Sequence, residues 1–423
     1  MAKTLVISID ALITADLERL QQLPNLSRIM KDASVVKDIE CIYPTLTYPC
    51  HTTIVTGCYP EKTGIVHNER LQPNAAKAEW NWWARDIRVP TVIDVAREAG
   101  LTTSTITWPV MCGMDADYNI GEIWAPAETD DPTPYFAQAD SPKAHAIFEK
   151  NKHMLNWMRT PPMDEFAAQC ACDIIAIEQP DLMLLHLSYV DHQRHFRGVH
   201  GPLDDAFAFV DSQVGRVLDA LDKRGAFEDT VFIVLGDHGQ LVLEKMFHLN
   251  AVLRDRGYID TENGVVTSWR AYAHSCSLSA QVYVAPGVDE EAVYKDLLAI
   301  QAEYPDMIEH VFTREEAERL HHVKGDFAFM IEAADKVCFS KGADSTEYVT
   351  AINDLKEYKP SVSNHGHLPQ KGDKPPFIIK GPGVRKDAVI PAGRLIDEAP
   401  TILAVLGLTM PTADGQCMTE LFE

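Results

Sequence analysis

Basic residues are scarce in this chain, and no run of five or more lysines and arginines occurs. Lysine and arginine total 38 while aspartate and glutamate total 62, so the formal net charge is −24. A chain of this charge repels the phosphate backbone of nucleic acid and an anionic membrane surface. We therefore expect no nucleic-acid polymer as a partner. If the substrate is itself an anion, positive charge must be supplied locally, which favours bound metal ions.

Apolar runs of membrane-spanning length are also lacking, so we expect no membrane insertion. The opening MAKTLVISID enters a strand-like segment without the basic and apolar regions of a secretion signal, which predicts a cytoplasmic location. The nine cysteines include no CxxC pair, so a disulfide framework and a thiolate zinc site are both disfavoured. The sequence does not indicate an oligomeric state.

The chain does contain short apolar, β-branched runs that alternate with amphipathic stretches. The clearest predicted strands cover residues 4–10, 103–108, 181–191, 230–239 and 376–383, and predicted helices cover 23–33, 89–100 and 203–225. Such alternation is typical of βαβ units. It predicts an α/β fold with a mainly parallel central sheet flanked by helices.

Residues from about 245 to 360 show a different pattern. Segment 280–307 predicts a strand and a helix, and segment 321–340 predicts a β-hairpin. We interpret 245–360 as an inserted α+β cap subdomain. Residues 1–244 and 361–423 then form one catalytic α/β core.

Three of the predicted core strands end in carboxylates, namely Asp10, Asp191 and Asp237. Ligands of an open parallel sheet bind beyond the carboxyl ends of its strands. Burying bare carboxylates there costs several kcal/mol unless each charge is paired or bound to a metal. No arginine or lysine excess accompanies these residues, so their convergence predicts divalent cations.

Histidines accompany these carboxylates at spacings that suit metal binding. Asp191 and His195 are four residues apart, His238 directly follows Asp237, and His365 lies in the later segment SNHGHLP. A single aspartate at a strand end is often only a helix cap, but here all four features occur together in order. Mixed aspartate and histidine ligands without thiolate suit Zn²⁺ at an open catalytic site, with Mn²⁺ as the alternative.

The stretch YPTLTYPCHTTIVTG, residues 43–57, predicts a helix start beside several hydroxyl groups. Pro49 suits the first helical position and Gly57 suits the end, which places the hydroxyl of Thr47 or Tyr48 just before the helix. A helix N-terminus stabilises anions, and a divalent ion favours the alkoxide of a threonine. The alternative is a capping threonine without chemistry.

Together the segments SIDA, YPTLTYPCHTTIVTGCYPEKTGIVHN, VDHQRH, LGDHGQ and SNHGHLP resemble the alkaline phosphatase superfamily, and in particular its nucleotide pyrophosphatase/phosphodiesterase branch. The resemblance implies two metal sites and a threonine nucleophile, Thr47, which attacks phosphorus and forms a phospho-threonine that water then hydrolyses. Carried onto this sequence, the ligands of the first ion are Asp10, Thr47, Asp237 and His238, and those of the second are Asp191, His195 and His365.

One position departs from the pattern of this branch. The branch has an asparagine after the proline that follows the nucleophile, placed to donate a hydrogen bond to a phosphate oxygen, and this chain has Cys50 there. A thiol is a much weaker donor than an amide. This predicts either another donor or a substrate other than a nucleotide diester.

We therefore predict a hydrolase that uses two divalent metal ions, most simply a phosphodiesterase or nucleotide pyrophosphatase that acts on a small phosphate ester. A phosphomonoesterase or phosphonate hydrolase would share the superfamily core. A sulfatase needs cysteine or serine in a CxPxR-like context, which neither Cys41 nor Cys50 has. A catalytically silent, metal-stabilised binding protein is the alternative from another class.

Overall fold

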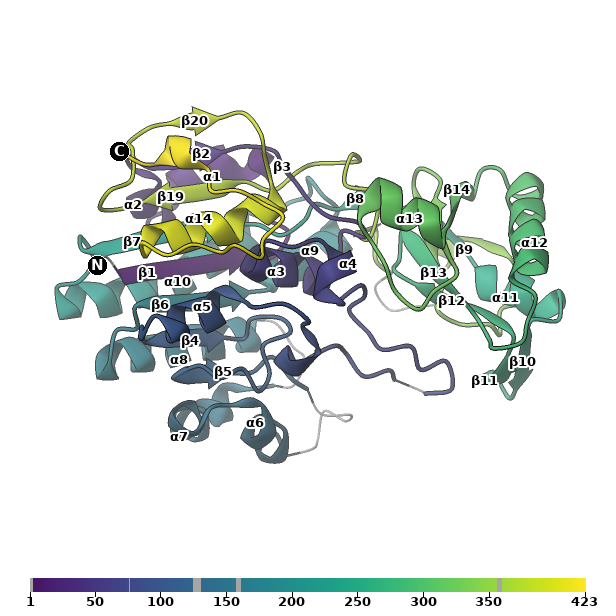
Figure 1. Ribbon diagram of the computed structural model, residues 1–423, viewed down its shortest axis with the longest axis horizontal. Coiled ribbons are helices and arrows are strands. Elements are labelled where there is room, and N and C mark those ends of the chain that lie inside the picture. The colour runs from purple at the N-terminus through teal and green to yellow at the C-terminus, as the bar shows by residue number, and fades with distance from the viewer. Residues whose placement is uncertain (1–2, 76, 125–130, 157–160, 356–359) are drawn as a thin grey trace.

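The computed structural model describes residues 3–75, 77–124, 131–156, 161–355 and 360–423 (Figure 1). A central sheet has the strand order β20-β2-β19-β7-β1-β6-β4-β5. From β7 to β5 all neighbours are parallel, whereas β19 is antiparallel to both β7 and β2. The strands are β20 (Val389–Ile390), β2 (Ser34–Val36), β19 (Phe377–Lys380), β7 (Thr230–Leu235), β1 (Lys3–Ile9), β6 (Leu182–Leu187), β4 (Thr103–Ile106) and β5 (Tyr118–Ile120). The predicted mainly parallel α/β fold is confirmed.

Helices cover both faces of this sheet, which explains why β1, β4, β6 and β7 are buried along almost their whole length. Successive residues of β1 point to opposite faces, so Leu5 and Ile7 pack in one core cluster and Val6 packs in the other. The first cluster includes residues of α7 (Pro142–Asn151), α8 (Pro162–Ile177) and α10 (Asp204–Arg224). The second includes residues of α3 (Thr47–Thr56), α5 (Val92–Glu98) and α14 (Glu398–Val405).

A second group of sheets lies between β8 (Leu241–Val242) and β18 (Ser363–Asn364), at the right of Figure 1. One is an antiparallel sheet of order β12-β13-β15-β14, another has order β16-β9-β17, and β10 pairs with β11. The elements are β9 (Lys245–Phe247), α11 (Leu249–Asp255), β10 (Ile259–Glu262), β11 (Val265–Trp269), β12 (Ala271–Ser275), β13 (Ser279–Val284), α12 (Glu290–Glu303), β14 (Ile308–Thr313), α13 (Arg314–His321), β15 (Phe329–Ala333), β16 (Val337–Phe339) and β17 (Val349–Ala351). The cap boundaries at 245 and 360 stay a prediction.

The β-hairpin predicted within 321–340 is wrong. Both edges of β15 are already occupied, by β13 and by β14. The next strand, β16, therefore pairs with β9 in a different sheet. Local sequence pattern does not reveal this, because the partners of β15 are distant in the chain.

The helix predicted to start at Pro49 starts two residues earlier, at Thr47. Leu46 is extended, with φ −110° and ψ 145°, and precedes the first turn. Proline is tolerated at the third helical position because the first four N–H groups of a helix have no intrahelical partner. Gly57 ends the helix with φ 65°, a conformation that favours glycine.

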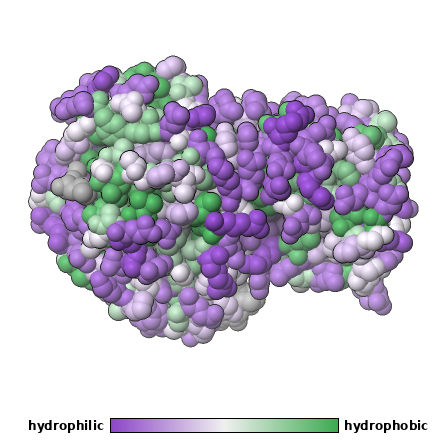
Figure 2. Space-filling view, viewed as in Figure 1, coloured by the Kyte–Doolittle hydropathy of each residue, from purple (hydrophilic) through white to green (hydrophobic). Residues whose placement is uncertain are grey.

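The remaining α-helices and strands are short. They are α1 (Leu17–Gln22), α2 (Leu26–Met30), β3 (Ile39–Glu40), α4 (Pro60–Thr63), α6 (Thr133–Ala139), α9 (Tyr189–Arg197) and β21 (Gly393–Arg394). Among the described helices, none is both long and apolar enough to cross a membrane. Figure 2 shows mainly hydrophilic residues over the junction near α4 and α13.

Candidate active site

Acidic residues and histidines gather at the carboxyl ends of three neighbouring parallel strands. Asp10 directly follows β1, and Asp237 and His238 follow β7. The predicted strand over 181–191 ends at Leu187, so Asp191 and His195 lie in helix α9, which follows β6. Because β7, β1 and β6 are adjacent, their ends converge on one edge of the sheet.

Asp10, Asp237 and His238 form the first group that can hold a metal ion, with one donor atom from each within 4.8 Å of the others. The Nε2 atom of His238 lies 3.2 Å from Oδ2 of Asp237 and 3.6 Å from Oδ1 of Asp10. The hydroxyl of Thr47 lies 3.2 Å from the same Nε2. The structure thus brings together the four residues predicted for the first ion.

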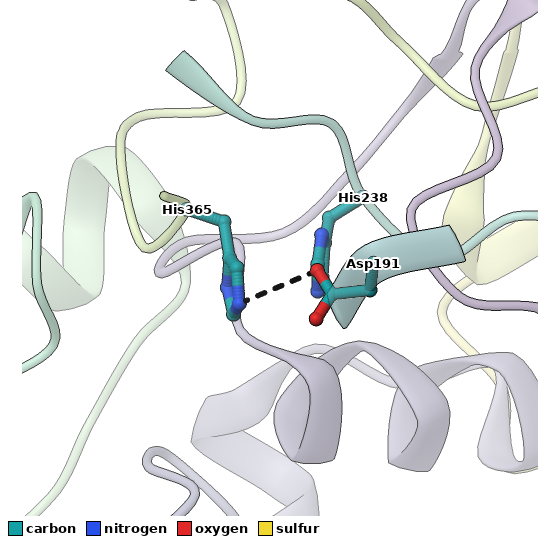
Figure 3. A group of neighbouring side chains, drawn as sticks. All are labelled: Asp191, His238 and His365. Atoms are coloured by element: carbon teal, nitrogen blue, oxygen red, sulfur yellow. Dashed lines mark ion pairs between the residues drawn. The ribbon is translucent and has the colours of Figure 1, made fainter. Parts of the chain in front are cut away.

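Asp191, His238 and His365 form a second such group (Figure 3). His365 Nε2 lies 3.9 Å from Oδ1 of Asp191, and His195 Nε2 lies 3.1 Å from its Oδ2. The rings of His238 and His365 stack with their centroids 3.9 Å apart. Because His238 belongs to both groups, the two are contiguous, and the residues predicted for the second ion lie beside those of the first.

Backbone carbonyls orient two of these histidines. His195 Nδ1 donates to the carbonyl of Ser363 at 2.9 Å, and His365 Nδ1 donates to that of Thr45 at 3.0 Å. A carbonyl only accepts, so in each neutral ring Nε2 keeps its lone pair. This is the arrangement of metal-binding histidines, whose second nitrogen usually donates to a fixed acceptor.

Gly366 lets the segment that carries His365 approach the rest of the chain closely. Its φ is 99°, and an added Cβ would lie 1.9 Å from the carbonyl oxygen of Cys276. The glycine therefore permits the contact that holds His365 in place.

Two buried carboxylate oxygens of the first group have no hydrogen-bond partner among the described residues. Oδ1 of Asp10 and Oδ2 of Asp237 are buried without a hydrogen bond from any described residue. Burial and the neighbouring Asp237 raise the pKa of Asp10 well above its usual range. Burial also raises the pKa of Asp237 to about 7. The donor set fits a divalent cation, since a cation would satisfy these oxygens and favour their ionised form.

The environment of Asp191 favours its charged form. Burial opposes ionisation of this carboxyl, but the rings of His195 and His365 outweigh it and hold the pKa below its usual range. Gln240 Nε2 also donates to Oδ1 of Asp191 at 2.6 Å. Asp191 is therefore an ionised carboxylate close to histidines, and carboxylate and histidine donors together are typical of Zn²⁺ sites.

Cys50, which stands where the family pattern has its asparagine, lies in the core behind the first turn of α3. Its side chain is fully buried in the core cluster with Ile54 and Val55. The helix begins at Thr47, and its register turns Cys50 toward the central sheet.

Asn68 and His51 are residues of this site that sequence reasoning missed. Asn68 Oδ1 accepts the Tyr48 amide at 2.9 Å, so its NH₂ group is left to donate to a ligand. Asn68 lines a cavity of about 270 Å³ together with His195 and His365. His51 Nδ1 donates to the Thr47 carbonyl at 2.8 Å and its Nε2 accepts from Ser8 Oγ at 2.8 Å, which fixes the first turn of α3.

Asp164 on α8 anchors the start of the helix that carries Asp191 and His195. Its Oδ1 accepts from both the amide and the hydroxyl of Ser188 at 3.0 Å, and its Oδ2 accepts the Tyr189 amide at 3.0 Å. The residue is 1% exposed. Water cannot replace these bonds, so α9 depends on Asp164 for its position.

We expect Asp164→Ala to destabilise the protein by about 2–4 kcal/mol, because it leaves buried N–H groups without acceptors. The midpoint of urea unfolding measures this loss. Glu165→Ala is the matched control on the same helix, because it leaves the hydrogen bonds from Asp164 to Ser188 and Tyr189 intact. Equal midpoints for the two variants would contradict the anchoring role.

Comparison with known proteins identifies the family. A family model described as Type I phosphodiesterase / nucleotide pyrophosphatase matches residues 4–351. Human ectonucleotide pyrophosphatase/phosphodiesterase family member 1 is 27% identical over 247 residues, which are 55% of this chain and 23% of that protein. An uncharacterized pyrophosphatase/phosphodiesterase of Schizosaccharomyces pombe is 28% identical over 248 residues, which are 54% of this chain and 44% of that protein. The chain thus spans less than half the length of these curated relatives.

Solved structures show the same fold. Mouse ectonucleotide pyrophosphatase / phosphodiesterase 5 matches with a TM-score of 0.70 and 21% identity over 100% of both chains. An inactive threonine-to-alanine form of that mouse protein, in complex with AMP, matches with a TM-score of 0.71 and 21% identity, again over 100% of both chains. Since the family model covers most of its length, this chain belongs to the Type I phosphodiesterase / nucleotide pyrophosphatase family.

Proposed function

We propose that this chain hydrolyses phosphodiester or pyrophosphate bonds in a small nucleotide-like substrate through a phospho-threonine at Thr47. The observation that carries the proposal is the position of the Thr47 hydroxyl, 3.2 Å from His238 Nε2 and next to two contiguous groups of metal-binding side chains. The names of the relatives and the AMP bound to the mouse protein support a nucleotide-like substrate.

Two divalent ions fit this site, and we propose Zn²⁺ with Mn²⁺ as the alternative. Asp10, Thr47, Asp237 and His238 would hold one ion, and Asp191, His195 and His365 would hold the other. Bound ions supply positive charge for the phosphoryl oxygens and favour the alkoxide of the nucleophile. Among the described residues, neither of these two groups contains a lysine or an arginine, and the chain as a whole has a net charge of −24. The positive charge at the site therefore has to come from bound ions.

The chain's own residues orient the reaction. Thr47 Oγ attacks phosphorus and forms the phospho-threonine while the alcohol or phosphate substituent departs. His51 holds the Thr47 carbonyl, which keeps the first turn of α3 in place. We propose that the Asn68 NH₂ group donates to a phosphoryl oxygen, the role that the sequence comparison placed at Cys50. Water from the cavity then cleaves the phospho-threonine and restores the hydroxyl.

A panel of chromogenic substrates tests this proposal. With bis(p-nitrophenyl) phosphate, p-nitrophenyl phosphate, p-nitrophenyl phenylphosphonate and p-nitrophenyl sulfate, we expect the highest kcat/KM on the diester. Elemental analysis should find about two transition-metal ions per chain, as a two-ion site requires.

Every other outcome of the substrate panel indicates a different activity for this protein. Faster turnover of the monoester or of the phosphonate would replace the proposal with a phosphomonoesterase or a phosphonate hydrolase. If the metal-loaded protein hydrolyses none of the four substrates, the protein is a catalytically silent binding protein. The family match favours none of these alternatives.

A further inference from the structure

The loop that carries His365 lies between the core and the cap, the name we give to the sheets between β8 and β18. It begins at His365, directly after β18, and leads toward β19. On the core side, the Thr45 carbonyl accepts the Gly366 amide at 2.9 Å, and the Thr45 hydroxyl donates to the His367 carbonyl at 3.1 Å. These bonds tie the start of the loop to the stretch that also contains the proposed nucleophile.

The cap holds the same loop from the other side. Ser279 Oγ, on β13, donates to the Gly366 carbonyl at 2.5 Å. Leu368 is 8% exposed and belongs to a buried apolar cluster. The cap residues of this cluster are Ala317, Val323, Phe327 and Met330. The loop therefore packs on the cap as well as on the core.

Glu332 of β15 supplies a charged contact between the cap and the loop. Its Oε1 accepts the Leu368 amide at 3.1 Å and pairs with Lys371 Nζ at 2.8 Å. Glu332 is 0% exposed, and Lys371 Nζ also donates to the neighbouring Ala333 carbonyl at 3.3 Å. Because side chains alternate along a strand, Glu332 faces the loop together with Met330. One buried carboxylate of the cap thus binds the loop at two positions.

This carboxylate lies in a place where its loss would move the loop. Without it, the Leu368 amide has lost its acceptor in the interior, which is costly unless the backbone shifts to find another. A metal site tolerates little movement, since its donors must stay within about 0.5 Å of the required geometry. His365 Nε2 lies 3.9 Å from Asp191 Oδ1 in the second metal-binding group, so a shift of the loop changes that group directly.

We propose that Glu332 is a positioning residue, through which the cap holds His365 in place for the second metal ion. The cap then sets the affinity of a site whose proposed ligands, Asp191, His195 and His365, all lie outside it. The inference rests on the proposed two-ion function, and it gives the cap a part in that function apart from any contact with substrate.

The affinity for Zn²⁺ measures this role independently of turnover. Competition with a chromogenic chelator gives the dissociation constants of the two ions in the full chain. His365→Ala identifies the constant of the second ion, because it removes a proposed ligand. In Glu332→Met we expect this constant to rise about tenfold, the lower end of the effect of residues that orient metal ligands, while the other stays within about twofold.

Two further variants separate positioning from a general loss of stability. Glu332→Gln keeps a side-chain oxygen that can accept the Leu368 amide, so it should restore most of the lost affinity. Ile331→Val alters the next residue of β15, which points to the opposite face and packs in the core cluster of the cap. It should lower the stability of the protein and change neither constant.

Lys371→Met tests the same contact by a milder change. The Lys371 side chain is 25% exposed and also pairs with Glu309, so its loss leaves the Leu368 amide bonded to Glu332. We expect the constant of the second ion to rise about threefold, as a partly exposed ion pair predicts. If Glu332→Met does not fold, an unchanged constant in Lys371→Met overturns the positioning role.

Three results with folded Glu332→Met would overturn the role. They are an unchanged constant for the second ion, an equal rise of both constants, and an equal loss in Ile331→Val. Wild-type protein that binds fewer than two ions would overturn the two-ion proposal together with the role of Glu332. Wild-type protein that binds two ions, with a second constant insensitive to Glu332, would overturn the role alone.

Discussion

Replacement of Thr47 by alanine should lower kcat on bis(p-nitrophenyl) phosphate by at least about 1000-fold, because it removes the proposed nucleophilic oxygen. Thr47 is 8% exposed, in the first turn of α3. Its hydroxyl faces His238 and donates to no backbone carbonyl in the described structure. Steady-state kinetics measure the effect, and a thermal melt shows whether the variant is folded.

The other threonines of the same stretch already have structural roles. Thr45 Oγ1 accepts the Gly366 amide and donates to the His367 carbonyl, at 3.0 and 3.1 Å. Thr52, Thr53 and Thr56 each donate to a backbone carbonyl nearby. We therefore expect Thr47→Ser, which keeps a hydroxyl, to retain measurable activity. Wild-type activity in Thr47→Ala would exclude Thr47 as the nucleophile.

Removal of the metal ions by a chelator should abolish hydrolysis and destabilise the fold. Binding to the folded state alone stabilises it by about 4 kcal/mol when the free metal concentration is about 1000 times Kd. The loss should be marked here because Asp10 and Asp237 are buried with oxygens that lack partners among the described residues. Thermal melts with and without chelator measure the change, and added Zn²⁺ or Mn²⁺ should restore both properties.

The metal-free protein should also become less stable as the pH rises from 3.8, the ordinary pKa of aspartate, to about 7. Burial raises the pKa of Asp237 to about 7, and the pKa of Asp10 shifts in the same direction. In this interval the folded state retains protons that the unfolded state has lost, so stability falls with pH, by about 1.4 kcal/mol per pH unit for one group.

Metal-loaded protein is the control for this pH dependence. Bound cations favour the ionised carboxylates, so the decline over the same interval should disappear. Unfolding midpoints across the interval measure both forms. Identical pH profiles with and without metal would contradict a cation at Asp10 and Asp237.

Most residues of the first metal-binding group could be predicted from the sequence. Asp10 directly follows a short apolar segment typical of a buried strand, and Asp237 and His238 come just after another. Parallel strands end at a common edge. Asp191 and His195 could be predicted for a related reason, since a spacing of four residues places both on one face of a helix. These inferences depend on local periodicity, which the sequence displays directly.

Other features depended on contacts between segments that are distant in the chain. Helix α3 begins at Thr47, so its register buries Cys50, while the loop after α4 brings Asn68 onto the Tyr48 amide. The pairing of β15 with β13 and β14, in place of a hairpin with β16, has the same origin.

The sequence by itself determined the α/β class, the carboxylates and histidines that follow the core strands, and the stretch that contains the proposed nucleophile. Only the tertiary structure decided which hydroxyl faces the metal-binding groups and which side-chain amide faces the cavity. The physical reason is that periodicity reports which face of a segment is buried, whereas the choice of neighbour depends on how buried surfaces and polar groups are satisfied across the whole chain.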